Sequence, residues 1–130
     1  AKDGVANVRF VVANGAEGLE RLVPPGGLHE LWTFFPDPWH KARHHKRRLV
    51  STEFADVVAS RLEPGGLWRL ATDADDYADA MREVLDAHPA LENVHGGWGP
   101  RFSARPVTKY EARGIAAGRE IRDLTYRRRS

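Results

Sequence analysis

Residues 28–35 read LHELWTFF, a nearly continuous apolar run that stops at the PDP sequence of residues 36–38. Apolar side chains at almost every position are typical of a strand buried on both faces, as in a parallel sheet. The two prolines fix φ and remove backbone donors, so the chain cannot continue as regular strand or helix. This stretch predicts an inner parallel strand that ends abruptly and presents Asp37 rigidly beyond its end.

Similar runs flank this strand on both sides of the sequence. Residues 5–13 and 67–71 are rich in strand formers, and apolar positions recur at helical spacing between the runs. The expected strands are residues 5–13, 28–35, 67–71, 91–98 and 120–127, and the expected helices are residues 16–22, 41–62 and 77–85. This order predicts an α/β fold, a parallel sheet with a closing antiparallel C-terminal strand pair.

Composition restricts the class of protein. The 130 residues correspond to one domain or a piece of one, with 42% hydrophobic and 29% charged residues, which argues against disorder and fibrous classes. We expect a soluble, cytoplasmic protein, because no apolar run approaches eighteen residues and no signal-peptide pattern is present. With no cysteine in the sequence, disulfides, cysteine nucleophiles and thiolate metal sites are excluded.

The net charge of +2 is unevenly distributed along the chain. Residues 41–48 carry five bases and no acid, and residues 101–130 carry nine bases against three acids. Between them, residues 49–100 carry ten acids against three bases. The first basic block lies at the start of an expected helix, where positive charge opposes the helix dipole, so an anionic partner is expected. The pattern predicts a surface that binds a polyanion such as nucleic acid, to which both basic blocks contribute.

Three polar residues follow expected strands: Asn14, Asp37 and Asp73. In parallel α/β sheets, ligands bind outside the carboxyl ends of the strands. Each residue alone could be an ordinary turn former or helix cap, but three at equivalent positions favour a site. No metal site is expected, because the adjacent His44 and His45 would not share one helix face.

A loop near the C-terminus contains Thr108 and Glu111 at the spacing of a capping box. The ordinary interpretation is a helix N-terminus. Alternatively, the carboxylate could accept hydrogen bonds from the Watson–Crick edge of guanine, and the residues alone leave both interpretations open.

Three stretches of the sequence resemble the bacterial tRNA (guanine-N7)-methyltransferases of the TrmB type. They are FFPDPWHKARHHKRRLV at residues 34–50, LATDADDYA at residues 70–78 and RPVTKYEARGIAAGREIRDLTYRR at residues 105–128. The resemblance implies a class I, Rossmann-like methyltransferase sheet that uses S-adenosylmethionine as methyl donor. The implied reaction methylates N7 of guanosine 46 in the variable loop of tRNA. The implied partners are tRNA and no membrane, for a monomer or homodimer.

The resemblance also implies roles for individual residues, and it requires no metal. Asp37 matches the catalytic aspartate, which also borders the methyl donor, and Asn14 matches a cofactor contact. The implied substrate-binding residues are Lys41, Asp73, Thr108, Lys109, Tyr110 and Glu111. The implied RNA-binding residues are Arg43, His44, His45, Lys46, Arg47 and Arg48.

One part of the family pattern is absent from this sequence. The first two family strands, with their glycine-rich turn, would precede Val5, so the fold is expected to be incomplete, as a single partial domain over residues 1–130. In the family order 3-2-1-4-5-7-6 the missing pair lies between residues 5–13 and 28–35. Residues 1–27 are therefore expected to be displaced, paired with a second chain or docked beside residues 28–35. A non-catalytic RNA-binding module is the alternative function.

Overall fold

The computed structural model describes residues 5–9, 19–21, 23–103 and 109–129. Its strands form one mixed sheet in the order β1-β2-β3-β5-β4. The strands are β1 (Val5–Arg9), β2 (Leu28–Phe34), β3 (Leu62–Thr72), β4 (Leu91–Asn93) and β5 (Arg122–Arg128). The helices are η1 (Ala42–Arg47, a 3₁₀ helix), α2 (Thr52–Arg61), α3 (Asp75–Asp86) and α4 (Lys109–Ala116). β1, β2 and β3 run parallel, while β5 is antiparallel to both β3 and β4, which confirms the predicted α/β plan.

The first strand lies directly beside the second. β1 pairs in parallel with β2, from Val5 opposite Leu28 to Arg9 opposite Trp32. Of the three positions expected for residues 1–27, the structure shows docking beside β2 for the described strand Val5–Arg9. The pairing gives the β1 backbone the hydrogen-bonding partners that an apolar strand requires.

The single helix expected over residues 41–62 is wrong, because the structure has two helices there. η1 ends before Arg48, whose backbone is extended at φ −60° and ψ 134°. α2 begins after Ser51, whose side chain accepts a hydrogen bond from the Phe54 amide at 3.2 Å. Ser51 is therefore an N-cap that starts a new helix. The extended residues between the helices carry the Arg48 side chain inward.

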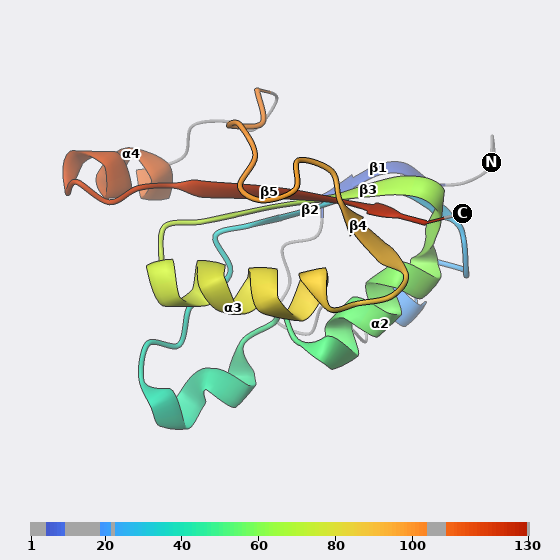
Figure 1. Cartoon of the computed structure of the whole chain (residues 1–130), viewed down its shortest axis with the longest axis horizontal. Helices are drawn as coiled ribbons and strands as arrows, with labels where there is room; N and C mark the ends of the chain where they lie inside the picture. The colour runs from blue at the N-terminus through green and yellow to red at the C-terminus, as the bar shows by residue number, and fades with distance from the viewer. Residues whose placement is uncertain (1–4, 10–18, 22, 104–108, 130) are drawn as a thin grey trace.

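Helices α2 and α3 cover one face of the sheet (Figure 1). Trp68 of β3 is fully buried there, donates its indole N–H to Thr33 at 2.9 Å and packs edge-on against Phe54 at 5.6 Å. Burying side chains of this size stabilises the fold by roughly 1.5–3 kcal/mol each, and this layer is the main core. The other buried side chains of this layer include Leu31, Leu70, Val58, Tyr77, Met81, Leu124 and Tyr126.

A loop after β4 crosses the opposite face of the sheet (Figure 1). Its Phe102 ring contacts Trp32 of β2 at 5.1 Å and lies under the Arg69 guanidinium at 4.0 Å. Arg69 also pairs with Glu30 at 3.0 Å. The carboxyl ends of β2 and β3 are adjacent, since Phe34 pairs with Ala71, so the residues that follow them meet at one edge.

Candidate functional site

The chain makes a strained turn where β2 ends. Phe35 donates its amide to the Ala71 carbonyl at 2.8 Å, which keeps the end of β2 attached to β3. Phe35 has φ +53° and Trp39 has φ +45°, both in the left-handed region that non-glycine residues rarely adopt. Each such residue costs of the order of 1–3 kcal/mol and persists only where surrounding contacts hold it, often at functional sites. Asp37 lies between these two strained residues.

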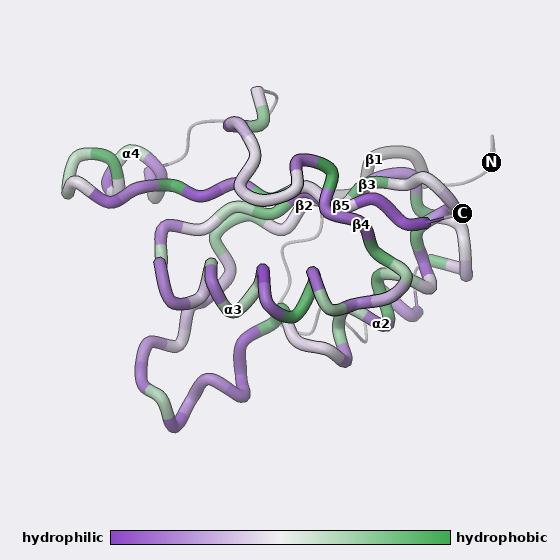
Figure 2. Tube along the Cα trace, viewed as in Figure 1, coloured by the Kyte–Doolittle hydropathy of each residue, from purple (hydrophilic) through white to green (hydrophobic). Residues whose placement is uncertain are grey.

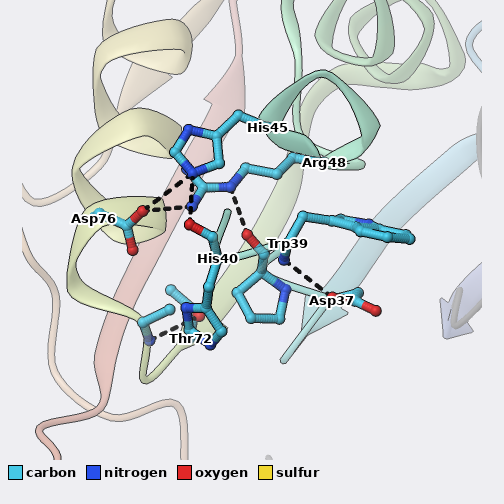
Figure 3. Close-up of polar contacts among 9 residues, drawn as sticks. Asp37, Trp39, His40, His45, Arg48, Thr72 and Asp76 are labelled. Atoms are coloured by element: carbon cyan, nitrogen blue, oxygen red, sulfur yellow. Dashed lines mark hydrogen bonds and ion pairs between the residues drawn. The ribbon is translucent and has the colours of Figure 1, made fainter. Parts of the chain in front are cut away.

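The Asp37 carboxylate is exposed but has a defined orientation. Its Oδ1 accepts a hydrogen bond from the Trp39 backbone amide at 3.0 Å (Figure 3). Because the donor lies two residues further along the chain, the contact locks the short turn around Pro38. The sequence-predicted catalytic residue is thus presented at the carboxyl end of an inner strand, as expected for a ligand site.

Arg48 occupies an interior position behind this turn. Its side chain is 7% exposed, and its Nε donates to the Pro38 carbonyl at 2.6 Å. Its Nη2 donates to Asp76 Oδ2 at 2.5 Å, and the guanidinium lies 4.7 Å from the Tyr77 ring centroid. The Arg48 hydrogen bond lowers the pKa of the Asp76 carboxyl below its usual value. The prediction that Arg48 contacts RNA is therefore not supported by its position, because burial removes it from the surface.

The other bases of the segment are exposed on and beside η1. No ion pair with a described acidic residue joins Lys41, Arg43, Lys46 or Arg47. Arg47 lies 5.2 Å from the Trp39 ring, and the His44 ring lies 5.7 Å from it. Figure 2 shows hydrophilic residues along most of η1, which projects from the helical side of the domain. These cations can meet a polyanion next to Asp37.

His45 lies between the exposed bases and the Arg48 network. Its Nε2 is 3.2 Å from the His40 carbonyl and 3.7 Å from Asp76 Oδ2 (Figure 3). His44 and His45 thus have different neighbours. No cluster of three or more His, Cys, Asp or Glu side chains that could hold a metal lies within the described part of the chain.

Asp73 follows β3 and contacts the C-terminal segment. Its Oδ2 accepts a hydrogen bond from Arg119 at 2.7 Å. A Cβ at Gly114 of α4 would lie 3.2 Å from the same oxygen, so glycine permits this close approach. The structure therefore brings two of the resembling stretches, residues 70–78 and 105–128, together at one edge.

Glu111 is buried, not open to a ligand. It is 2% exposed, and its two carboxylate oxygens accept from Arg101 at 2.9 and 3.3 Å. This bidentate pair ties α4 to the loop that crosses the sheet. Lys109, at the start of α4, is exposed. Asn14, Thr108 and the side chain of Tyr110 lie outside the described residues.

The last arginines lie far from Asp37. β5 is antiparallel to β3, so Arg122 pairs with Thr72 at the site edge while Arg127 pairs with Leu67 further along the strand. The C-terminus lies at the opposite end of the sheet from α4 (Figure 1). The contribution of these last residues to one surface with the first block therefore stays a prediction, because they lie toward the other end of β5 from Asp37. Sequence reasoning also missed Asp76 and Arg119 as partners, although an acid in the first turn of a helix is a recognisable signal.

Comparison with known proteins identifies relatives over nearly the whole chain. The model of a family described as "Putative methyltransferase" matches residues 1–124. A protein from Nocardioides sp. named tRNA (guanine-N(7)-)-methyltransferase is 60% identical over 126 residues, which cover 97% of this chain and 50% of the relative. One of the same name from Cutibacterium acnes is 57% identical, covering 96% of this chain and 46% of the relative. The chain spans about half the length of these relatives.

Among solved structures, the aminoglycoside resistance methyltransferase NpmB1 matches 80% of this chain and 53% of its own, at 14% identity and a TM-score of 0.42. No helix among the described residues has the length and apolar character needed to cross a membrane.

Proposed function

Because the chain belongs to this family of putative methyltransferases, we propose that it is the reacting and RNA-binding part of an S-adenosylmethionine-dependent tRNA (guanine-N7)-methyltransferase. The proposed target is guanosine 46 of the variable loop, in the cytoplasm, and the protein acts as a monomer or homodimer. The observation that carries the proposal is the oriented Asp37 carboxylate, held by the amide of Trp39, whose ring lies 5.2 Å from the guanidinium of the exposed Arg47 of η1. The site combines a fixed negative charge for the reacting centre with a positive surface for RNA.

The chemistry requires alignment more than proton transfer. S-adenosylmethionine supplies a methyl group on a positively charged sulfur. The lone pair of guanine N7 forms the new N–C bond as the C–S bond breaks, and the positive charge passes to the purine. No proton leaves N7, so Asp37 need not act as a base. A carboxylate held in place instead stabilises this developing charge and orients the reactants.

The fit of the methyl donor to this site rests on charge. The exposed Asp37 carboxylate complements a sulfonium cation, and it lies at the strand edge where such ligands bind. Asn14 is retained as a proposed contact to the donor on the basis of the resemblance. Asp37 is thus the described residue that borders both reactants in the proposal.

RNA binding is assigned to the exposed bases of η1 and its flanks. Arg43, Lys46 and Arg47, with Lys41 before them, can contact phosphates. His44 and His45 are also assigned to the proposed RNA surface. The His44 ring packs near the Trp39 ring, and His45 lies beside Asp76. The exposed cations therefore supply most of the affinity for tRNA.

The substrate side is assigned to the Asp73 and α4 region. Lys109, Thr108 and Tyr110 are proposed to contact the guanosine. Asp73 and Glu111 already accept hydrogen bonds from arginines, so they act by holding α4 in place or by exchanging an arginine for the base. In both cases Asp73 and Glu111 belong to the part of the proposed site that recognises the nucleoside.

Methyl transfer from labelled S-adenosylmethionine to a tRNA transcript tests the function in the whole protein that contains this chain. We expect the labelled methyl group to be incorporated into the tRNA, and chain cleavage specific to 7-methylguanosine to locate it at guanosine 46. A transcript with adenosine at position 46 should incorporate no label. Titration calorimetry with S-adenosylmethionine separates the alternative. tRNA binding without binding of the methyl donor by the whole protein would show a non-catalytic RNA-binding module.

A further inference from the structure

The peptide group between Pro38 and Trp39 is held at both ends. Its carbonyl accepts a hydrogen bond from Arg48 Nε at 2.6 Å, and its N–H donates to Asp37 Oδ1 at 3.0 Å (Figure 3). A peptide group is planar, so its carbonyl and N–H directions are not independent. The contact with Arg48 therefore sets the direction of the N–H that orients the Asp37 carboxylate.

Arg48 is itself held by the N-terminal turn of α3. Its second contact is Asp76, at 2.5 Å, and its guanidinium stacks over Tyr77. The Tyr77 hydroxyl in turn accepts from the Val50 amide at 2.9 Å, so α3 also fixes the backbone that follows Arg48. The planar fork of a guanidinium can reach a carbonyl and a carboxylate together, which a lysine ammonium cannot do with the same geometry.

The strained turn needs such a support. Phe35 and Trp39 keep left-handed backbone angles that would relax in a free loop. Among the described side chains outside residues 36–39, Arg48 is the one with a recorded hydrogen bond to this segment. A charged donor on a carbonyl also polarises the peptide group and strengthens the bond that its N–H makes.

We infer that Arg48 is a positioning residue of the proposed methyl-transfer site, which holds the Pro38–Trp39 peptide group and through it the Asp37 carboxylate. The inference rests on the proposed function and separates Arg48 from the other bases of residues 41–48. Arg48 acts on the reacting carboxylate from the interior, whereas its exposed neighbours act on RNA.

Steady-state kinetics of the whole protein distinguishes the two roles. Arg48→Met should lower kcat about tenfold or more while the KM for tRNA stays within about twofold, because only the alignment of Asp37 is lost. Lys46→Met removes one charge two residues away and should do the reverse, raising KM with little change in kcat. Arg48→Lys, which keeps the charge but not the fork, should lie between wild type and Arg48→Met. A rise in KM for Arg48→Met equal to that of Lys46→Met, at unchanged kcat, would overturn the inference.

A second measurement is independent of activity. In the wild type, the Trp39 amide proton should resonate downfield in nuclear magnetic resonance spectra, because that amide donates to the Asp37 carboxylate. In Arg48→Met this downfield shift should be lost, and in Arg48→Lys it should be reduced. Melting temperature confirms folding, and Asp76 is 54% exposed, so Arg48→Met leaves no buried charge behind.

The two measurements separate the inference from the function on which it rests. A wild-type protein that transfers no methyl group would refute the proposed function, while the chemical shift of the Trp39 amide still decides the role of Arg48. Persistence of the full downfield shift of the Trp39 amide in folded Arg48→Met would refute the positioning role even if the enzyme is active.

Discussion

The two basic blocks of the chain, residues 41–48 and 101–130, carry similar net charges of +5 and +6 but have opposite surroundings. Among the Lys and Arg side chains of the first block, Arg48 alone forms an ion pair with a described acid, and the others are exposed. In the second block four of the seven described arginines are paired. The pairs are Arg101–Glu111 at 2.9 Å, Arg119–Asp73 at 2.7 Å, Arg122–Glu120 at 3.0 Å and Arg127–Glu92 at 3.9 Å.

This difference shows that the net charge of a sequence segment does not indicate how many of its charged side chains can attract a polyanion. The acidic middle of the chain supplies Asp73 and Glu92 to the second block, 46 and 35 residues away in sequence from their partners Arg119 and Arg127. Charges paired in this way attract a polyanion less, since each acid cancels the field of its partner within a few ångströms. The first block lies on and beside η1, a short helix that projects from the domain (Figure 1). Its exposed cations therefore keep most of their attraction for a polyanion.

The largest expected effect concerns Asp37, which adjoins the first block. Asp37→Asn should lower kcat for methyl transfer by about 100-fold or more, because it removes a fixed charge from the reacting centre while the amide keeps the shape. The affinity for tRNA should change by no more than a few-fold. Asp79→Asn, an exposed acid on α3, is the matched control. Full activity of Asp37→Asn would remove the assigned role.

The second effect tests the two blocks directly. Arg43, Lys46 and Arg47 changed together to alanine should weaken binding to all tRNAs alike. Each lost phosphate contact should flatten the log–log dependence of affinity on salt by about 0.7–0.9, so the triple variant should lose about 2–3. Filter binding over a salt series measures this slope.

The matched triple variant changes Arg119, Arg122 and Arg127 of the second block to alanine. Because these arginines are paired with acids, we expect a smaller change in slope for the same loss of charge. Equal slopes for the two triple variants would show that the ion pairs do not distinguish the blocks.

A third change concerns the stability of the second block. Glu111→Ala should lower the free energy of unfolding by about 1–3 kcal/mol, because a buried hydrogen-bonded side chain is lost. Urea denaturation measures this loss, and Glu120→Ala, at an exposed acid of the same block, should change it little. Similar values for both would mean that the buried pair does not stabilise α4.

The smallest effect is the acid dependence of the Arg48 contact. The hydrogen bond from Arg48 lowers the folded-state pKa of Asp76 below the usual 3.8. The stability it contributes is therefore present above about pH 4 and is lost as the pH falls through the lowered folded-state pKa. Because Asp76 is more than half exposed, we expect about 0.5 kcal/mol. Melting temperatures between pH 2 and 6 should decline less steeply for Asp76→Asn, and identical slopes would contradict the contact.

Local sequence patterns were sufficient to predict most of the strands and helices and the edge of the sheet at which the candidate site lies. The apolar run of β2, its stop at the PDP sequence and the helical spacing of Tyr77, Met81 and Leu85 predicted an α/β sheet with Asp37 and Asp73 at adjacent strand ends. These features depend on side-chain periodicity and on the fixed φ of proline, which act within a few residues. The roles of individual residues came from the family resemblance, because one aspartate after a strand has several ordinary explanations.

Tertiary structure alone decided which charges are available and which are buried. Arg48 is adjacent to Arg47 in a uniformly basic run, yet only the break between η1 and α2 turns it inward to Asp76, 28 residues away. Likewise, Arg119 meets Asp73 across 46 residues, and β1 docks on β2 as its available parallel neighbour. Electrostatic pairing and sheet order depend on distances in space between segments remote in sequence, so no local pattern could determine them.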